Sequence, residues 1–126
     1  MAEGKLRAAE NRRQAEEESR RKARERMVTE DQIIMFNELE TKVETFYREL
    51  TVLSKKNPDL PLNRFKLKFL NDVLSQTTQL LGDRHRPFPD FEMFDDADLP
   101  SVSDAVLMLS HYSKALAKFK SYHSII

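Results

Sequence analysis

The sequence contains no cysteine and no tryptophan, and it has two glycines, Gly4 and Gly82. Without cysteine the chain cannot form a disulfide, react through a thiol or hold zinc or an iron–sulfur cluster through thiolates. Tight hairpin turns and phosphate-binding loops both depend on glycine, so a β-sheet and a nucleotide-binding loop are disfavoured. No stretch reaches the roughly 18 apolar residues that a membrane span needs. These absences favour a small helical protein.

The charges cancel over the whole chain but not along it. Basic and acidic residues number 21 each, so no overall field would attract nucleic acid or an anionic membrane. Residues 1–26 nevertheless carry nine basic and six acidic side chains, whereas residues 82–100 carry two and six. We therefore expect a charged arm at 1–29 and one folded domain at 30–126, with an acidic-aromatic loop at 83–100.

The arm has almost nothing to bury, because Leu6 is the one large apolar residue between positions 5 and 26. Three acid–base pairs follow with the acid four residues ahead: Glu16 with Arg20, Glu17 with Arg21 and Glu18 with Lys22. Each such pair stabilises a helix by about 0.2–0.5 kcal/mol. That only partly offsets helix nucleation, so we expect a solvated arm that is helical for part of the time.

The start of the chain also bears on location. It is charged where a secretory signal is apolar, and it carries three consecutive glutamates where a mitochondrial presequence is poor in acids. We therefore expect a cytoplasmic protein.

The first expected helix covers residues 30–56. Its apolar residues recur in steps of three and four: Phe36, Leu39, Val43, Phe46, Leu50 and Leu53. This heptad pattern is typical of a coiled coil or of one face of a helical bundle. Continued backwards, the pattern meets Lys22 and Glu25, so a coiled coil should not enter the arm. We favour the bundle, with self-association through Ile33, Ile34 and Met35 as the alternative.

Two more helices are expected. Pro58 ends the first helix, Pro61 suits the first turn of a helix over 61–81, and Gly82 should cap that helix. This second helix carries two apolar stripes: Leu62, Phe65, Phe69, Val73 and Leu80, and Leu67, Leu70, Leu74 and Leu81. A helix that is apolar on two faces needs two neighbours, so it should be the central element, in contact with both other helices or with one of them and a partner. Ser101 should cap a third helix over 101–122. The predicted fold is all-α: an antiparallel three-helix bundle with a charged helical extension.

The loop at 83–100 places Phe88, Phe91 and Phe94 among prolines and acidic residues. Unstructured connections longer than about 12–15 residues are uncommon unless they are functional or packed down by their own side chains. The three rings should therefore fold back as a lid over the bundle, or dock in an apolar groove of a partner. We take them as candidate partner-binding residues, together with Ile33, Ile34 and the outward-facing Leu107.

No combination of residues indicates chemistry. The three histidines lack the i,i+3 or i,i+4 partner of a helical metal site, and Asp95, Asp96 and Asp98 lack the spacing of a calcium loop. We expect no catalytic residues, no metal, no cofactor and no small-molecule substrate.

The predicted function is a non-enzymatic protein–protein interaction module, as an adaptor or as an assembly subunit of a larger complex. The alternative is a nucleic-acid-associated accessory protein. Its contacts would be basic residues of the arm and of the two later helices: Arg12, Arg13, Arg20, Arg21, Arg64, Lys68, Lys114 and Lys118. In the arm these cations alternate with acids, and no aromatic side chain is present for base stacking.

Overall fold

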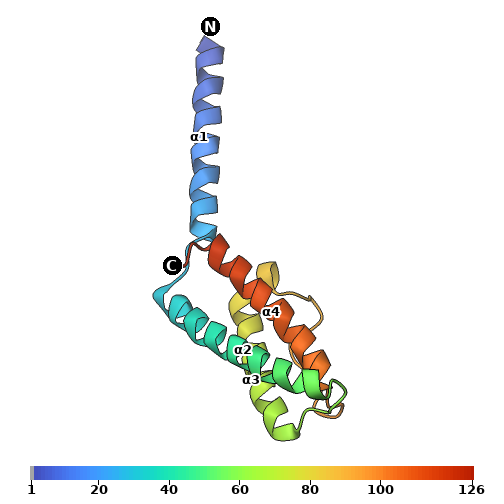
Figure 1. The fold of residues 1–126 in the computed structure, drawn as a ribbon. Coiled ribbons are helices and arrows are strands. Elements are labelled where there is room, and N and C mark those ends of the chain that lie inside the picture. Colours follow the sequence, from blue (N-terminus) through green and yellow to red (C-terminus); the bar gives the residue numbers. More distant parts are fainter. Residues whose placement is uncertain (1) are drawn as a thin grey trace.

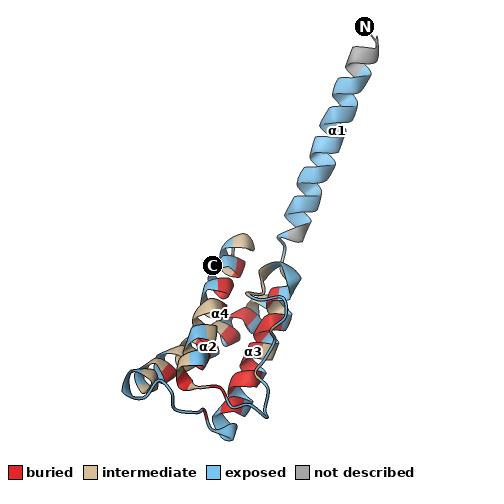
Figure 2. Ribbon diagram, turned by 90° about the vertical axis from the view of Figure 1, so that its right-hand side faces the viewer, coloured by how far each residue is buried: buried red, intermediate tan, exposed pale blue. Residues whose placement is uncertain are grey.

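The computed structural model describes residues 2–126, and the side chains of residues 6–24 and 26–126. It contains four helices: α1 (Ala2–Glu25), α2 (Glu30–Lys56), α3 (Arg64–His85) and α4 (Val102–Tyr122) (Figure 1). The predicted all-helical class is confirmed. Helices α2, α3 and α4 pack around one core, whereas α1 projects from them and all of its described side chains are exposed (Figure 2). The expected exchange between helix and coil in the arm stays a prediction.

The predicted bounds of α2 are confirmed, and a reciprocal cap explains where this helix begins. The Thr29 hydroxyl accepts a hydrogen bond from the Gln32 N–H at 3.1 Å, and the Gln32 side-chain oxygen accepts one from the Thr29 N–H at 2.9 Å. This capping box satisfies two backbone donors that a helix start leaves without a partner.

Helix α3 differs from the prediction at both ends. It begins at Arg64 instead of Pro61, because the Asn63 side chain caps it by accepting from the Lys66 N–H at 2.8 Å. At the other end Gly82 has a φ of +67°, which glycine adopts without strain, and one further turn follows to His85. Gly82 therefore kinks the helix where we expected it to end the helix, and the loop starts at residue 86.

Helices α3 and α4 run in the same direction, and α2 runs antiparallel to both (Figure 1). The segments before α3 and α4 lie together, because the Leu62 N–H donates to the Pro100 carbonyl at 2.9 Å and the Val102 N–H donates to the Leu60 carbonyl at 2.8 Å. The prediction of an antiparallel arrangement throughout is therefore wrong for this pair. The reason is the connection, which is long enough to return along the whole length of the bundle.

The core lies between the three packed helices and holds one buried polar network. Phe36 of α2 stacks on Phe119 of α4, with ring centroids 5.8 Å apart. The fully buried Tyr112 donates its hydroxyl to Thr78 at 2.6 Å, and Thr78 donates to the Leu74 carbonyl at 2.9 Å, so these buried groups are satisfied. Burial raises the pKa of Tyr112 above its ordinary value, which keeps this donor protonated.

Helix α3 contacts both other packed helices, as its two stripes predicted, but it is not the most extensively packed of the three. The most extensive interface joins α2 to α4, and α3 packs against both. The second stripe of α3 is buried, but Phe65 and Phe69 of the first stripe are exposed.

The loop after α3 is bound to the body by side chains that hold its backbone. Asn71, which is 6% exposed, donates from Nδ2 to the Phe94 carbonyl at 2.9 Å and accepts from the Phe94 N–H at Oδ1, also at 2.9 Å. Arg86 donates to the carbonyls of Phe88 at 3.1 Å and Phe91 at 2.8 Å. The loop therefore covers the groove between α3 and α4.

Replacing Asn71 by Ala should lower the free energy of unfolding by about 2–3 kcal/mol, because both backbone groups of Phe94 lose their partner in a partly buried place. Urea denaturation measures this change. The control is Gln76→Ala on the exposed side of α3, which should stay within about 0.5 kcal/mol of the parent protein. Equal stability of the two variants would show that Asn71 does not anchor the loop.

Candidate functional site

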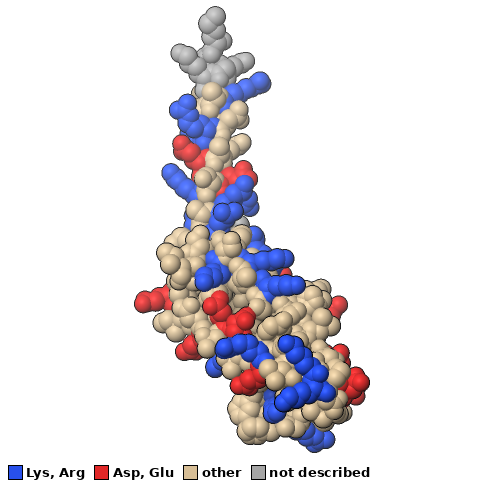
Figure 3. All heavy atoms as spheres, in the orientation of Figure 1, with Lys and Arg blue, Asp and Glu red and all other residues tan. Residues whose placement is uncertain are grey.

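The basic residues of the arm do not form a continuous patch. Of the three expected ion pairs, Glu18 with Lys22 forms at 3.4 Å, and the other two are absent among the described side chains. Figure 3 shows basic and acidic side chains interleaved along α1. Exposed side chains gain little from pairing in water. The arm therefore presents both signs of charge on the face that Figure 3 shows.

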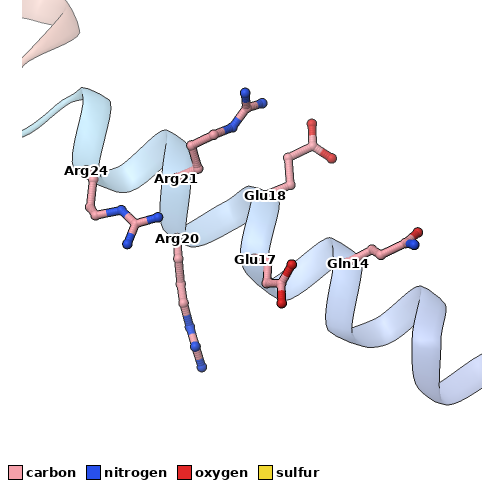
Figure 4. Close-up of a pocket in the computed structure, with 6 residues that line it drawn as sticks. All are labelled: Gln14, Glu17, Glu18, Arg20, Arg21 and Arg24. Atoms are coloured by element: carbon pink, nitrogen blue, oxygen red, sulfur yellow. The ribbon is translucent and has the colours of Figure 1, made fainter.

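Six polar side chains of α1 border a shallow hollow on the arm: Gln14, Glu17, Glu18, Arg20, Arg21 and Arg24. They point outward from a single helix, and no second element closes over them (Figure 4). Arg12 and Arg13 are exposed in the same way. This face is open surface, without the enclosure that a small-molecule site needs.

The structure does not bring the remaining candidate nucleic-acid contacts together. Arg64 and Lys68 lie near the start of α3 and line a hollow of about 410 Å³ that also contains the carboxylates of Asp72 and Asp96. Lys114 and Lys118 are exposed in the second half of α4, which runs parallel to α3. The four cations therefore sit on separate parts of the body, and acids offset one pair.

The candidate aliphatic contacts are also dispersed. Ile33 is partly buried and packs against the core, its neighbour Ile34 is exposed, and Leu107 is exposed on α4. These residues do not form one surface. Their role in binding a partner stays a prediction.

The loop aromatics lie on the body. Phe91 and Phe94 are half-buried against the core with ring centroids 5.1 Å apart, and Phe91 lies 6.4 Å from the Tyr112 ring. Phe88 is more exposed, and its ring stands against His111 at 5.0 Å. This is the arrangement that the lid interpretation describes. Partner binding by these three rings stays a prediction.

The largest exposed aromatic surface lies on α3 and is formed by Phe65 and Phe69, two residues of the predicted first apolar stripe. Phe65 is 73% exposed and Phe69 is 47% exposed, and their rings pack edge to face with centroids 4.9 Å apart. At about 100° per residue, Phe65 lies roughly 160° around the helix from the buried Leu67, so it points away from the core. We call Phe65 and Phe69 the Phe pair.

A hollow lies farther along the groove between α2 and α3. Met35 of α2, which is 42% exposed, and Leu80 of α3 line a space of about 280 Å³ with Asp31 and three glutamines. At about 100° per residue, Phe69 lies within about 20° of Leu80 around α3, so the Phe pair and the hollow share one side of that helix. We call this surface the α2/α3 face; its apolar members are Met35, Phe65, Phe69 and Leu80.

No described segment of the chain covers the α2/α3 face. The loop closes the groove between α3 and α4, and Ser113 of α4 donates a hydrogen bond to Glu44 across the interface with α2. Contiguous exposed apolar side chains on a folded protein mark interaction surfaces. The sequence pattern could not separate Phe65 and Phe69 from core residues, because it gives the face of the helix and not its exposure. The structure shows that both side chains are exposed.

Histidines gather where the arm meets the body. The His85 ring lies 4.9 Å from the Tyr122 ring and 5.7 Å from the His123 ring, and His123 Nδ1 lies 2.7 Å from the Arg26 carbonyl oxygen. His85 Nε2 is buried without a hydrogen-bond partner among the described residues. Burial lowers the pKa of His85, and the nearby His123 and Arg84 lower it further.

Among the described residues no group of three His, Asp or Glu side chains is placed to hold a metal ion. No helix in the described part of the chain combines the length and the apolar character that crossing a bilayer requires. Comparison of the chain with protein-family models, with curated proteins and with solved structures found no match. The function must therefore be inferred from the surfaces themselves.

Acidification should destabilise the fold through His85. Because its folded-state pKa lies below the ordinary value of about 6.5, the unfolded chain binds more protons, and the free energy of unfolding should fall as the pH drops below about 6.5. The loss should level off once the pH is below the folded-state pKa. Urea unfolding of the parent protein and of His85→Phe between pH 8 and pH 5 tests this, and the variant should show the shallower slope. Equal slopes would contradict the assignment.

Proposed function

We propose that the protein is a non-enzymatic interaction module, as an adaptor or assembly subunit in the cytoplasm, that binds a protein partner through the α2/α3 face. The observation that carries the proposal is the exposure of the Phe pair, two contacting aromatic rings, on the surface of the folded body. Removing apolar surface from water stabilises a complex by about 25 cal/mol per Å². Phenylalanine is among the aromatic residues that are enriched in protein interfaces, so two phenyl rings on one ridge suit a binding anchor.

The shape of the surface favours a helical partner. Two antiparallel helices bound a groove with apolar side chains along it, and an amphipathic helix lays its apolar face into such a groove. Lys68, Asp72 and Gln76 are exposed beside the Phe pair and supply the polar rim that interfaces have. In this proposal residues 30–126 form the docking body, a three-helix bundle, and residues 1–29 form a solvated helical extension.

Nucleic-acid binding is the second candidate, and one local feature favours it. Arg64, Lys66 and Lys68 alternate with the exposed Phe pair, a combination that can hold phosphates and stack bases. The nearby carboxylates of Asp72 and Asp96 oppose phosphate binding. The salt dependence separates the two candidates, because phosphate contacts weaken steeply with salt and an apolar interface does not.

Replacing the Phe pair by Ser should abolish partner binding and leave the fold intact, because both rings are mostly outside the core. The experiment is affinity capture from the native cell with the parent chain, with Phe65→Ser/Phe69→Ser, and with a chain that lacks residues 1–26. Proteins held by the parent chain and by the truncated chain should be lost from the Ser variant.

The matched control is Lys114→Ser/Lys118→Ser on the outer face of α4, which should retain the same partners in moderate salt. Circular dichroism and melting temperature confirm that each variant is folded. Retention of all partners by the Ser variant, or their loss from the control alone, would contradict the placement of the interface.

A further inference from the structure

The Phe pair and the hollow lie on the same face but at opposite ends of α3. The Phe pair is near the start of α3, and the hollow is bounded by Gln76, Gln79 and Leu80 near its end. The two features are about 11 residues apart, which is roughly 16 Å along a helix. One surface therefore carries both a projecting apolar group and a recess lined by Met35 and Leu80.

A two-fold axis that lies in the plane of the contact, at right angles to the helices, brings two copies face to face and reverses the direction of the helices. It would place α2 over the partner's α2 and α3 over the partner's α3, each antiparallel to its counterpart. In this arrangement the Phe pair of each copy meets the hollow of the other, so the same contact forms twice. Such self-complementary contacts are what two-fold dimers are built from.

The charges follow the same pattern. Arg64, Lys66 and Lys68 flank the Phe pair and are only partly offset by Asp72 and Asp96, whereas Asp31 lines the hollow and Glu38 is exposed two turns farther along α2. The antiparallel arrangement brings the basic end of one copy against the acidic end of the other. Complementary potentials of this kind fix the register of an interface and disfavour other registers.

From these placements we propose that the α2/α3 face binds a second copy of this chain and forms a two-fold antiparallel dimer. This inference rests on the proposed function and names its partner. The face is about 33 Å long and about 20 Å wide, from the helix rise and the width of two packed helices. About 600 Å² per copy lies at the lower limit for specific interfaces, so the dimer should dissociate on dilution.

Sedimentation velocity of the full chain over a wide concentration range tests the proposal. The parent protein should change from monomer to dimer as its concentration rises. Phe65→Ser/Phe69→Ser should weaken self-association at least 30-fold with unchanged circular dichroism, and Lys114→Ser/Lys118→Ser should match the parent. A Ser variant that still dimerises like the parent would overturn the proposed face.

Charge reversal tests the antiparallel register. Arg64→Glu/Lys68→Glu should weaken the dimer about tenfold, and so should Asp31→Lys/Glu38→Lys, because each places like charges against the other copy. All four substitutions in one chain should restore the parent's affinity, since the two ends again carry opposite charges. Failure of this rescue would overturn the register.

Asp72 supplies a second test of the axis, because it lies between the Phe pair and the hollow, where the two copies bring their carboxylates close together. Asp72→Asn should therefore tighten the dimer. A parent chain that stays monomeric at every concentration overturns the proposal of a second copy. If the Phe pair then still captures a different protein, the proposed function stands and only the dimer is wrong. If the pair binds a single-stranded oligonucleotide instead, both the proposed function and the dimer are wrong.

Discussion

The two hydrogen bonds between the Asn71 side chain and the Phe94 backbone determine how this chain closes its fold. Because α3 and α4 run in the same direction, the segment between them must return along the bundle, and its buried polar groups need partners. Asn71 supplies both a donor and an acceptor at the right place on α3. With Phe94 held there, Phe91 and Phe94 pack against the core, and the groove between α3 and α4 is filled from within the chain.

Because the loop covers the groove between α3 and α4, the α2/α3 face is the apolar surface left for a partner. The loop fills the groove between α3 and α4, and α2 packs more extensively on α4 than on α3. The α2/α3 face keeps the Phe pair in water, although rings of that size would be stabilised by burial. The surface that the fold does not use is therefore the surface on which recognition of a partner can depend.

Local signals in the sequence were sufficient to predict the all-helical class, the bounds of α2 and most of α4. The spacing of Thr29 and Gln32 is typical of a capping box at the start of α2. Asn63 has the side chain of an N-cap, so the start of α3 could also have been predicted from the sequence. The direction of α4 and the two hydrogen bonds between Asn71 and Phe94 could not be predicted, because they depend on contacts between residues far apart in the chain. Periodicity assigned the Phe pair to a core stripe, since it shows which residues share a face but not which face meets a neighbour.

Amide hydrogen exchange at Phe94 measures most directly whether the loop is an integral part of the fold. If the hydrogen bonds from Asn71 hold the loop over the groove between α3 and α4, the Phe94 N–H should exchange almost as slowly as the core amides of α4. Both would then need global unfolding to exchange. Exchange at the rate of an unstructured peptide, with the α4 amides still protected, would contradict this. The groove between α3 and α4 would then be as open to partners as the α2/α3 face.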